Sequence, residues 1–247
     1  GSLLAWVILG RRTRVMSNHL GSRTMPEFFG SRYNSQALKV VASAIVFVFL
    51  VPYTASVYNG LSRLFEMAFG IPYIYCVIGM AVLTCIYVVL GGYMATAVND
   101  LIQGIVMLFG IVLVIAAVLA NNGGFIDAIG QLAQIESVEA VTAGQPGAYT
   151  SFFGPDPLNL LGVVLLTSLG TWGLPQMVHK FYAIKSEKAV YTGTIISTFF
   201  ALIVAGGSYF LGGFSRLYDS PAIYDAAGNI VYDSIIPTML STLPDVV

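Results

Sequence analysis

Two polar side chains, Asp100 and Gln103, follow a glycine-rich break between two long apolar runs. A carboxylate is costly near hydrocarbon and sodium prefers hard oxygen ligands, so an acid at a membrane edge points to an ion path. The same spacing also suits a helix cap. Asp100-x-x-Gln103 is a capping pair for a helix starting at Leu101, and a carboxylate is favoured at a helix N-terminus. The residues alone leave both interpretations open.

A second candidate site lies in SLGTWGLPQMVHKFYAIKS, residues 168–186, where two glycines and a proline interrupt an apolar run. A proline inside a helix frees backbone carbonyl groups from their hydrogen bonds. Broken helices are tolerated at membrane depth where they line a cavity, and they are a sequence pointer to solute sites. A simple proline kink is the alternative. The candidate solute-binding residues are Trp172, Gly173, Pro175 and Gln176.

Other kinds of chemistry have no local support. The sequence contains no G-x-x-x-x-G-K-S/T, no G-x-S-x-G and no C-x-x-C pattern. His19 and His179 have no ligand partners at metal spacing. We therefore expect no enzymatic activity, no resident cofactor or metal and no nucleic-acid partner.

Composition indicates a membrane protein with an all-α fold. Of the 247 residues, 57% are hydrophobic and 9% are charged, against roughly 25% charged in ordinary soluble domains. About 20 apolar residues are needed to cross a bilayer. Residues 72–120 would form a helix of about 73 Å and must fold back, with GGYMATAVND as the turn-like break. Five complete spans are predicted, near residues 37–62, 72–97, 101–120, 157–178 and 190–213.

The loop charges predict an orientation, because Lys and Arg concentrate on the cytoplasmic side. The loop 121–156 carries acids and neither Lys nor Arg, and the tail 214–247 is acidic, so we expect both outside. The inside is marked at or before the first span by Arg11, Arg12, Arg14, Arg23, Arg32 and Lys39, and after the fourth span by His179, Lys180, Lys185 and Lys188. Both ends look cut, so we expect a portion of a longer protein.

The segment between the first arginines and the first full span has a capping box. Thr24-x-x-Glu27 has the T-x-x-E form, with Pro26 in the first turn, so a short surface helix is predicted there. TMPEFFGSRY, residues 24–33, resembles the loop after the second core helix of the sodium:solute symporter family, usually T-x-P-E-F-L-G-x-R-F/Y.

Two more stretches resemble the same family. GGYMATAVNDLIQ is similar to its G-G-x-x-A-V-x-x-T-D-x-x-Q stretch, although Asn99 replaces the usual Thr and the Ala-Val pair is shifted. The W-G-x-P-Q form at Trp172 resembles the proline, pantothenate and carboxylate branches more than the sugar branch. The residues of the first stretch that match in kind are Gly91, Gly92, Ala97, Asp100 and Gln103.

The resemblance implies part of an inverted-repeat core of five plus five helices in the plasma membrane. It implies symport of sodium, as the coupling ion, with a small organic solute, favouring an amino acid or a carboxylate, by alternating access. Asp100 and Gln103 would lie on the sodium pathway, and the segment at Trp172 would contact solute. The family's first and eighth core helices are missing, so we expect no transport by this chain alone. A non-transporting structural or regulatory membrane subunit is the alternative.

Overall fold

The computed structural model describes residues 2–139, 141–184, 186–224 and 228–243. Three charges of the predicted loop pattern, Lys185, Asp225 and Asp245, lie outside these residues. Within the described ranges the fold is all-α, as predicted, and the β-pairing there is a single bridge between Tyr224 and Ile230.

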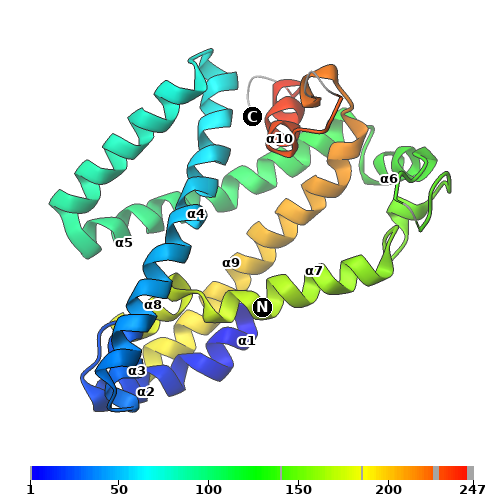
Figure 1. The fold of residues 1–247 in the computed structure, drawn as a ribbon. Coiled ribbons are helices and arrows are strands. Elements are labelled where there is room, and N and C mark those ends of the chain that lie inside the picture. Colours follow the sequence, from blue (N-terminus) through cyan, green and yellow to red (C-terminus); the bar gives the residue numbers. More distant parts are fainter. Residues whose placement is uncertain (1, 140, 185, 225–227, 244–247) are drawn as a thin grey trace. The chain divides into compact units, whose positions relative to one another are not determined.

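The helices follow one another along the whole chain (Figure 1). The first half contains α1 (Ser2–Ala5), the π-helical segment η1 (Trp6–Gly10), α2 (Arg11–Leu20), α3 (Met25–Arg32), α4 (Gln36–Phe69), α5 (Tyr73–Asn121) and α6 (Phe125–Gln134). The second half contains η2 (Ala148–Thr150), α7 (Pro157–Leu169), η3 (Gly170–Gly173), α8 (Pro175–Ala183), α9 (Glu187–Phe214), η4 (Ser215–Leu217), η5 (Pro221–Ile223) and α10 (Tyr232–Ser241).

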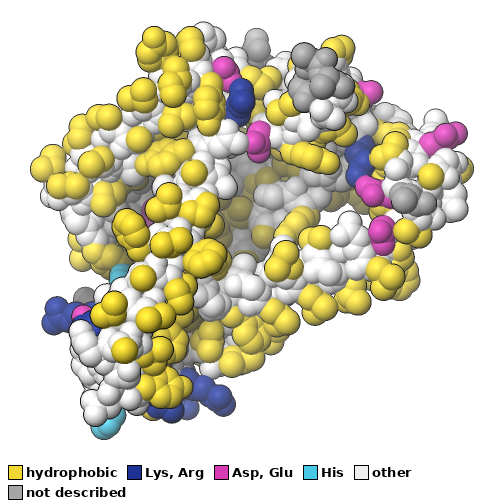
Figure 2. Space-filling view, viewed as in Figure 1, with side chains coloured by type: hydrophobic (Ala, Val, Ile, Leu, Met, Phe, Trp, Pro, Cys, Tyr) yellow, Lys and Arg dark blue, Asp and Glu magenta, His cyan; other side chains and the backbone are white. Residues whose placement is uncertain are grey.

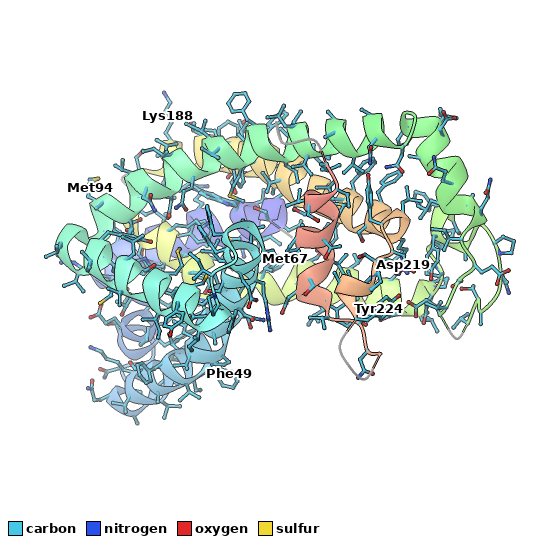
Figure 3. The ribbon with its side chains drawn as sticks, turned by 90° about the horizontal axis from the view of Figure 1, so that it is seen from above. Phe49, Met67, Met94, Lys188, Asp219 and Tyr224 are labelled. Carbon is cyan, nitrogen blue, oxygen red and sulfur yellow. The ribbon has the colours of Figure 1, made fainter. Side chains whose placement is uncertain are left out.

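Among the described residues, three helices are long and apolar enough to cross a membrane: α4, α5 and α9 with its extension to Leu217. The pair α7–η3 and α8, bent by 43°, adds a fourth candidate span. Large apolar side chains remain exposed along these helices, and Figure 2 shows hydrophobic side chains over much of the visible surface. Figure 3 shows Phe49 and Met94, 69% and 73% exposed, pointing away from their helices. Such surfaces suit a bilayer, where lipid tails surround them. The chain is therefore an integral multi-pass membrane protein.

Helix α5 contains the turn that its length demands. Its 49 residues include one non-helical residue, Gly92, with φ 59° and ψ −159°. Only glycine adopts this region readily. The break lies in the predicted GGYMATAVND stretch but at its start, so Asp100 lies inside a continuing helix. The capping interpretation of Asp100 is therefore wrong, because a helix interior has no free N–H groups to cap.

The residues divide into two compact units. The first comprises Gly1–Pro52 and Asp156–Leu202 and has a small core of Trp6, Val178, Phe181 and Val190. The rings of Trp6 and Phe181 meet edge to face, 5.0 Å between centroids. Gly193 lies against Trp6, because a Cβ there would come within 2.8 Å of the indole ring. The segment η1 and helix α9 therefore pack closely at this glycine.

The second unit comprises Tyr53–Pro155 and Ile203–Val247. Its core is formed by Val118, Ala128, Leu211, Phe214, Met239 and Leu243. Asn122 ties two of its segments together by donating its Nδ2–H to the hydroxyl of Tyr218 at 2.7 Å. Arg216 lies over the ring of Tyr149, 3.9 Å from its centroid. In Figure 3 the hydroxyl of Tyr224 lies near Asp219, to which it donates at 3.1 Å.

Candidate functional site

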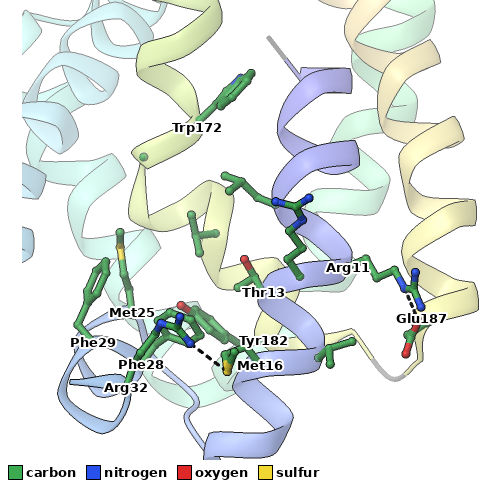
Figure 4. A pocket seen from close by; sticks show the side chains of 15 residues that line it. Arg11, Thr13, Met16, Met25, Phe28, Phe29, Arg32, Trp172, Tyr182 and Glu187 are labelled. Atoms are coloured by element: carbon green, nitrogen blue, oxygen red, sulfur yellow. Dashed lines mark hydrogen bonds and ion pairs between the residues drawn. The ribbon is translucent and has the colours of Figure 1, made fainter. Parts of the chain in front are cut away.

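The first unit contains an open pocket of about 900 Å³ (Figure 4). Three segments form its walls: the N-terminal part of α2 with the end of η1, the helix α3, and the broken segment of η3 and α8 with the first residue of α9. The lining residues are Leu9, Arg11, Arg12, Thr13, Val15, Met16, Met25, Phe28, Phe29, Arg32, Trp172, Gly173, Val178, Tyr182 and Glu187.

The wall formed by α3 depends on the capping box. The Thr24 hydroxyl accepts a hydrogen bond from the Glu27 backbone N–H at 3.3 Å, and Glu27 accepts one from the backbone N–H of Arg23 at 3.0 Å. The predicted surface helix and its cap are therefore confirmed. The Arg23 N–H is the main reason that the pKa of Glu27 lies below its ordinary value, with further lowering by Lys39 and Thr24.

The position of the α3 side chains follows from this start. Phe28 packs against Tyr182 of α8, with ring centroids 6.2 Å apart. Arg32, one turn further along α3, donates a weak hydrogen bond to the Sδ of Met16 in α2 at 3.5 Å. Helix α3 thus contacts both other walls of the pocket.

The broken helix supplies the third wall. Asp156 caps α7 by accepting from the backbone N–H groups of Leu158 and Asn159, and Pro157 occupies its first turn. The helix then tightens through η3, and Leu174 is extended, with φ −65° and ψ 128°. The residue before a proline is driven to this conformation by the proline ring. The break predicted from glycine and proline is confirmed, and it presents Trp172 and Gly173 to the pocket.

The end of α2 is held next to α9 by one ion pair. The Nε of Arg11 lies 2.6 Å from Oε2 of Glu187. The two side chains are 75% and 52% exposed, so the pair positions the wall more than it stabilises it. Just before α2, the chain passes through the π-helical segment η1, a distortion that is often found at functional sites.

The predicted solute residues are only partly brought together. Trp172 and Gly173 line the pocket, whereas Pro175 and Gln176 are absent from its lining; Pro175 is half-buried and Gln176 is exposed. Trp172 is half-buried. The break thus divides the predicted set, because α8 turns away from the axis of α7 after Leu174.

The predicted ion residues belong to the second unit. Asp100 and Gln103 lie three residues apart on α5, both exposed. Residues at this spacing share a helix face, so both side chains reach the same surroundings. Within the described part of the chain, no hydrogen bond or ion pair reaches the Asp100 carboxylate. No three His, Cys, Asp or Glu residues in that part are grouped to hold a metal ion.

Several lining residues were assigned other roles from sequence. The arginines were interpreted as orientation signals. Nothing in local spacing says that α3 faces η3, more than a hundred residues later. The one available signal was that both segments resemble motifs of one family. As a site, the pocket is suited to noncovalent binding, since its lining offers apolar surface and guanidinium groups.

Comparisons with known proteins agree with the resemblance found in the sequence. The sequence model of the sodium:solute symporter family matches residues 1–243. Sodium/proline symporters of Staphylococcus aureus, including those of strains JH9 and Newman, are 31% identical over 193 residues, which cover 76% of this chain. The matched region covers 35% of the length of those relatives. No solved structure matches significantly.

Proposed function

This chain belongs to the sodium:solute symporter family, and on that premise we propose that it works within a protein that couples sodium entry to uptake of a small organic solute. The observation that carries the proposal is the pocket, since it joins two segments that the sequence links to this family, α3 and the break at Trp172. Family membership points to a transporter rather than an enzyme.

The proposed solute is an amino acid or a carboxylate, with proline as the first candidate. This choice rests on the W-G-x-P-Q form of the broken helix and on the relatives whose name is sodium/proline symporter. Trp172 and Gly173 are proposed to contact the solute from the pocket. Pro175 is proposed to maintain the break in the helix, and Gln176 is proposed to supply a polar group beyond the break.

The proposed coupling uses sodium alone as the coupling ion. Asp100 and Gln103 present oxygen atoms on one face of α5, and oxygen is the ligand that hard cations prefer. Asp100 does not cap a helix, and we propose that its carboxylate binds sodium along the ion pathway. An inward-negative plasma membrane would add about 2.3 kcal/mol per charge per 100 mV to the driving force.

Alternating access requires segments that change their angle while the rest stays packed. Two such segments are present: the bend of 43° between η3 and α8, and the break of α5 at Gly92. Each separates two apolar helical pieces. We propose that these breaks are where the helices pivot during solute release.

The experiment is uptake by the full-length protein in proteoliposomes. Labelled proline, pantothenate, a short carboxylate and a sugar are compared with and without an inward sodium gradient. We expect accumulation of one solute only with the gradient. Equal signals for every solute would contradict sodium coupling and favour a structural or regulatory subunit.

Two variants then test the assigned roles. Asp100→Asn is expected to abolish the sodium dependence, whereas Glu136→Gln, which changes an exposed acid of the loop after α6, is expected to leave it intact. Trp172→Phe is expected to raise the KM for solute without changing the sodium dependence. A sodium dependence unaffected by Asp100→Asn would remove this residue from the ion pathway.

A further inference from the structure

The pocket is larger and more apolar than a small solute requires. Its volume of about 900 Å³ is near the upper end of the range for drug-sized ligands. A solute held at Trp172 would occupy one end and leave the walls of α2 and α3 uncovered. Figure 4 shows Trp172 well separated from Met25, Phe28 and Arg32. A small solute therefore does not account for the α2–α3 end of the pocket, and a second ligand is considered for it.

The charged side chains that line the pocket are mostly positive. Arg11, Arg12 and Arg32 line the pocket, together with one acid, Glu187. Glu187 is engaged by Arg11, so within the described residues Arg12 and Arg32 have no carboxylate partner. Both side chains lie in exposed residues. Guanidinium groups bind phosphate well because their donors match its oxygen atoms.

The apolar part of the lining at this end comes from α2 and α3 and is adaptable. Val15 and Met16 come from α2, and Met25, Phe28 and Phe29 come from α3. Methionine side chains fill irregular space and accommodate flexible partners. A ligand that fits must therefore carry both an anionic group and a long apolar portion.

The position of α3 in the chain further restricts the chemical class of the ligand. Helix α3 is a short capped helix immediately before the apolar helix α4, in the basic stretch that predicts the cytoplasmic side. Figure 2 shows Lys and Arg side chains gathered at the end of the first unit that carries α2 and α3. The cytoplasmic leaflet carries anionic lipids, and basic pockets between membrane helices on that side bind their headgroups.

We propose that the α2–α3 end of this pocket binds one anionic phospholipid. Arg32 binds the headgroup phosphate at the α3 end, Arg12 adds a second positive charge in the same pocket, and the acyl chain lies along the methionine and phenylalanine side chains. Phe28 of α3 already contacts Tyr182 of α8. A lipid lying against Phe28 would therefore strengthen the packing of α3 against the broken helix. The proposal does not depend on sodium coupling or on the identity of the solute.

Native mass spectrometry of the full-length protein tests the proposal. The purified protein in detergent is titrated with phosphatidylglycerol and, separately, with phosphatidylcholine of the same acyl chains. The variant is Arg12→Gln with Arg32→Gln. The matched control, Arg23→Gln with Lys188→Gln, removes the same charge from exposed residues of the same unit outside the lining. Thermal unfolding midpoints confirm that all three proteins fold.

We expect the unaltered protein and the control to retain one phosphatidylglycerol in preference to phosphatidylcholine. The lining variant should bind phosphatidylglycerol roughly thirty-fold more weakly, at the energy typical of two basic residues near an anionic membrane. Added glycerol phosphate should not displace the lipid, because it lacks the acyl chain.

Three outcomes would overturn the proposal. Equal weakening in the control would show a general charge effect rather than a site. Displacement by glycerol phosphate at similar concentration would show a soluble anion site. Absence of any preference for phosphatidylglycerol in the unaltered protein would show that another segment of the longer protein, or nothing anionic, covers this end of the pocket.

Discussion

Replacing Gly92 by alanine should destabilise the protein by opposing the turn inside α5. The residue has φ 59° and ψ −159°, and a Cβ there would have open space around it. The penalty is therefore conformational rather than a collision. Residues held in this region cost about 1–3 kcal/mol unless they are glycine.

Replacing a second glycine in the same turn should also destabilise the protein, but for a different reason. Gly91 has helical surroundings, but a Cβ added to it would collide with the Cβ of Ala95. Gly91→Ala therefore destabilises the turn by crowding, whereas Gly92→Ala does so by backbone strain. Gly110 in the same helix offers the control, because nothing lies within 4 Å of the position of its Cβ. Gly110→Ala should stabilise the helix by roughly 0.5–1 kcal/mol.

The assay is thermal unfolding of the three variants in one detergent, followed by circular dichroism. For a chain of this size, each kcal/mol shifts the midpoint by about 2–4 °C. Gly92→Ala should lower it by roughly 2–12 °C, and Gly110→Ala should raise it by roughly 1–4 °C. If Gly92→Ala is as stable as Gly110→Ala, α5 does not turn at Gly92 and the fold-back lies elsewhere.

Three smaller predictions concern the first unit. Gly193→Ala should lower the unfolding midpoint by several degrees because its Cβ would meet an indole ring at 2.8 Å, whereas Gly206→Ala in the same helix, with open space, should not. Glu27→Gln should slightly destabilise the protein above about pH 4.5, because the lowered pKa of Glu27 means that its ionised form stabilises the fold. The difference in unfolding midpoint should vanish as the pH falls through that lowered pKa, and midpoints measured from pH 7 to 3 test this. A double-mutant cycle on Arg11→Gln and Glu187→Gln should give a coupling below about 1 kcal/mol, because both side chains are largely exposed; a value of several kcal/mol would show a buried pair.

Local features of the fold were predictable because short-range rules decide them. In the T-x-x-E pattern, the Thr24 hydroxyl accepts from the backbone N–H of Glu27 and so favours the start of a helix. This local hydrogen bond does not depend on distant parts of the chain. The proline at 175 forces its predecessor out of the helix, so the break near Trp172 could be expected. The apolar run of residues 72–120 is too long for one span, so a turn was required, although its exact residue was misplaced.

The error at Asp100 shows where local rules stop. Asp-x-x-Gln satisfies the capping pattern, yet the backbone turns eight residues earlier, at a glycine that alone accepts the required angles. A capping pattern lowers the cost of a helix start but does not create one. Of the two interpretations that the residues left open for Asp100, the cap is therefore wrong, and the ion pathway stays a prediction.

The sequence by itself determined the membrane character, the all-α class, the helix breaks at glycine and proline, and the family. The first three follow from composition, periodicity and steric rules that act within a few residues, and the family follows from the resemblance of short motifs. Only the tertiary structure decided that Phe28, Arg32 and Trp172 line one pocket while Gln176 does not. The physical reason is that segments distant in sequence meet through side-chain packing, and the direction of α8 after its break determines which side chains face the cavity.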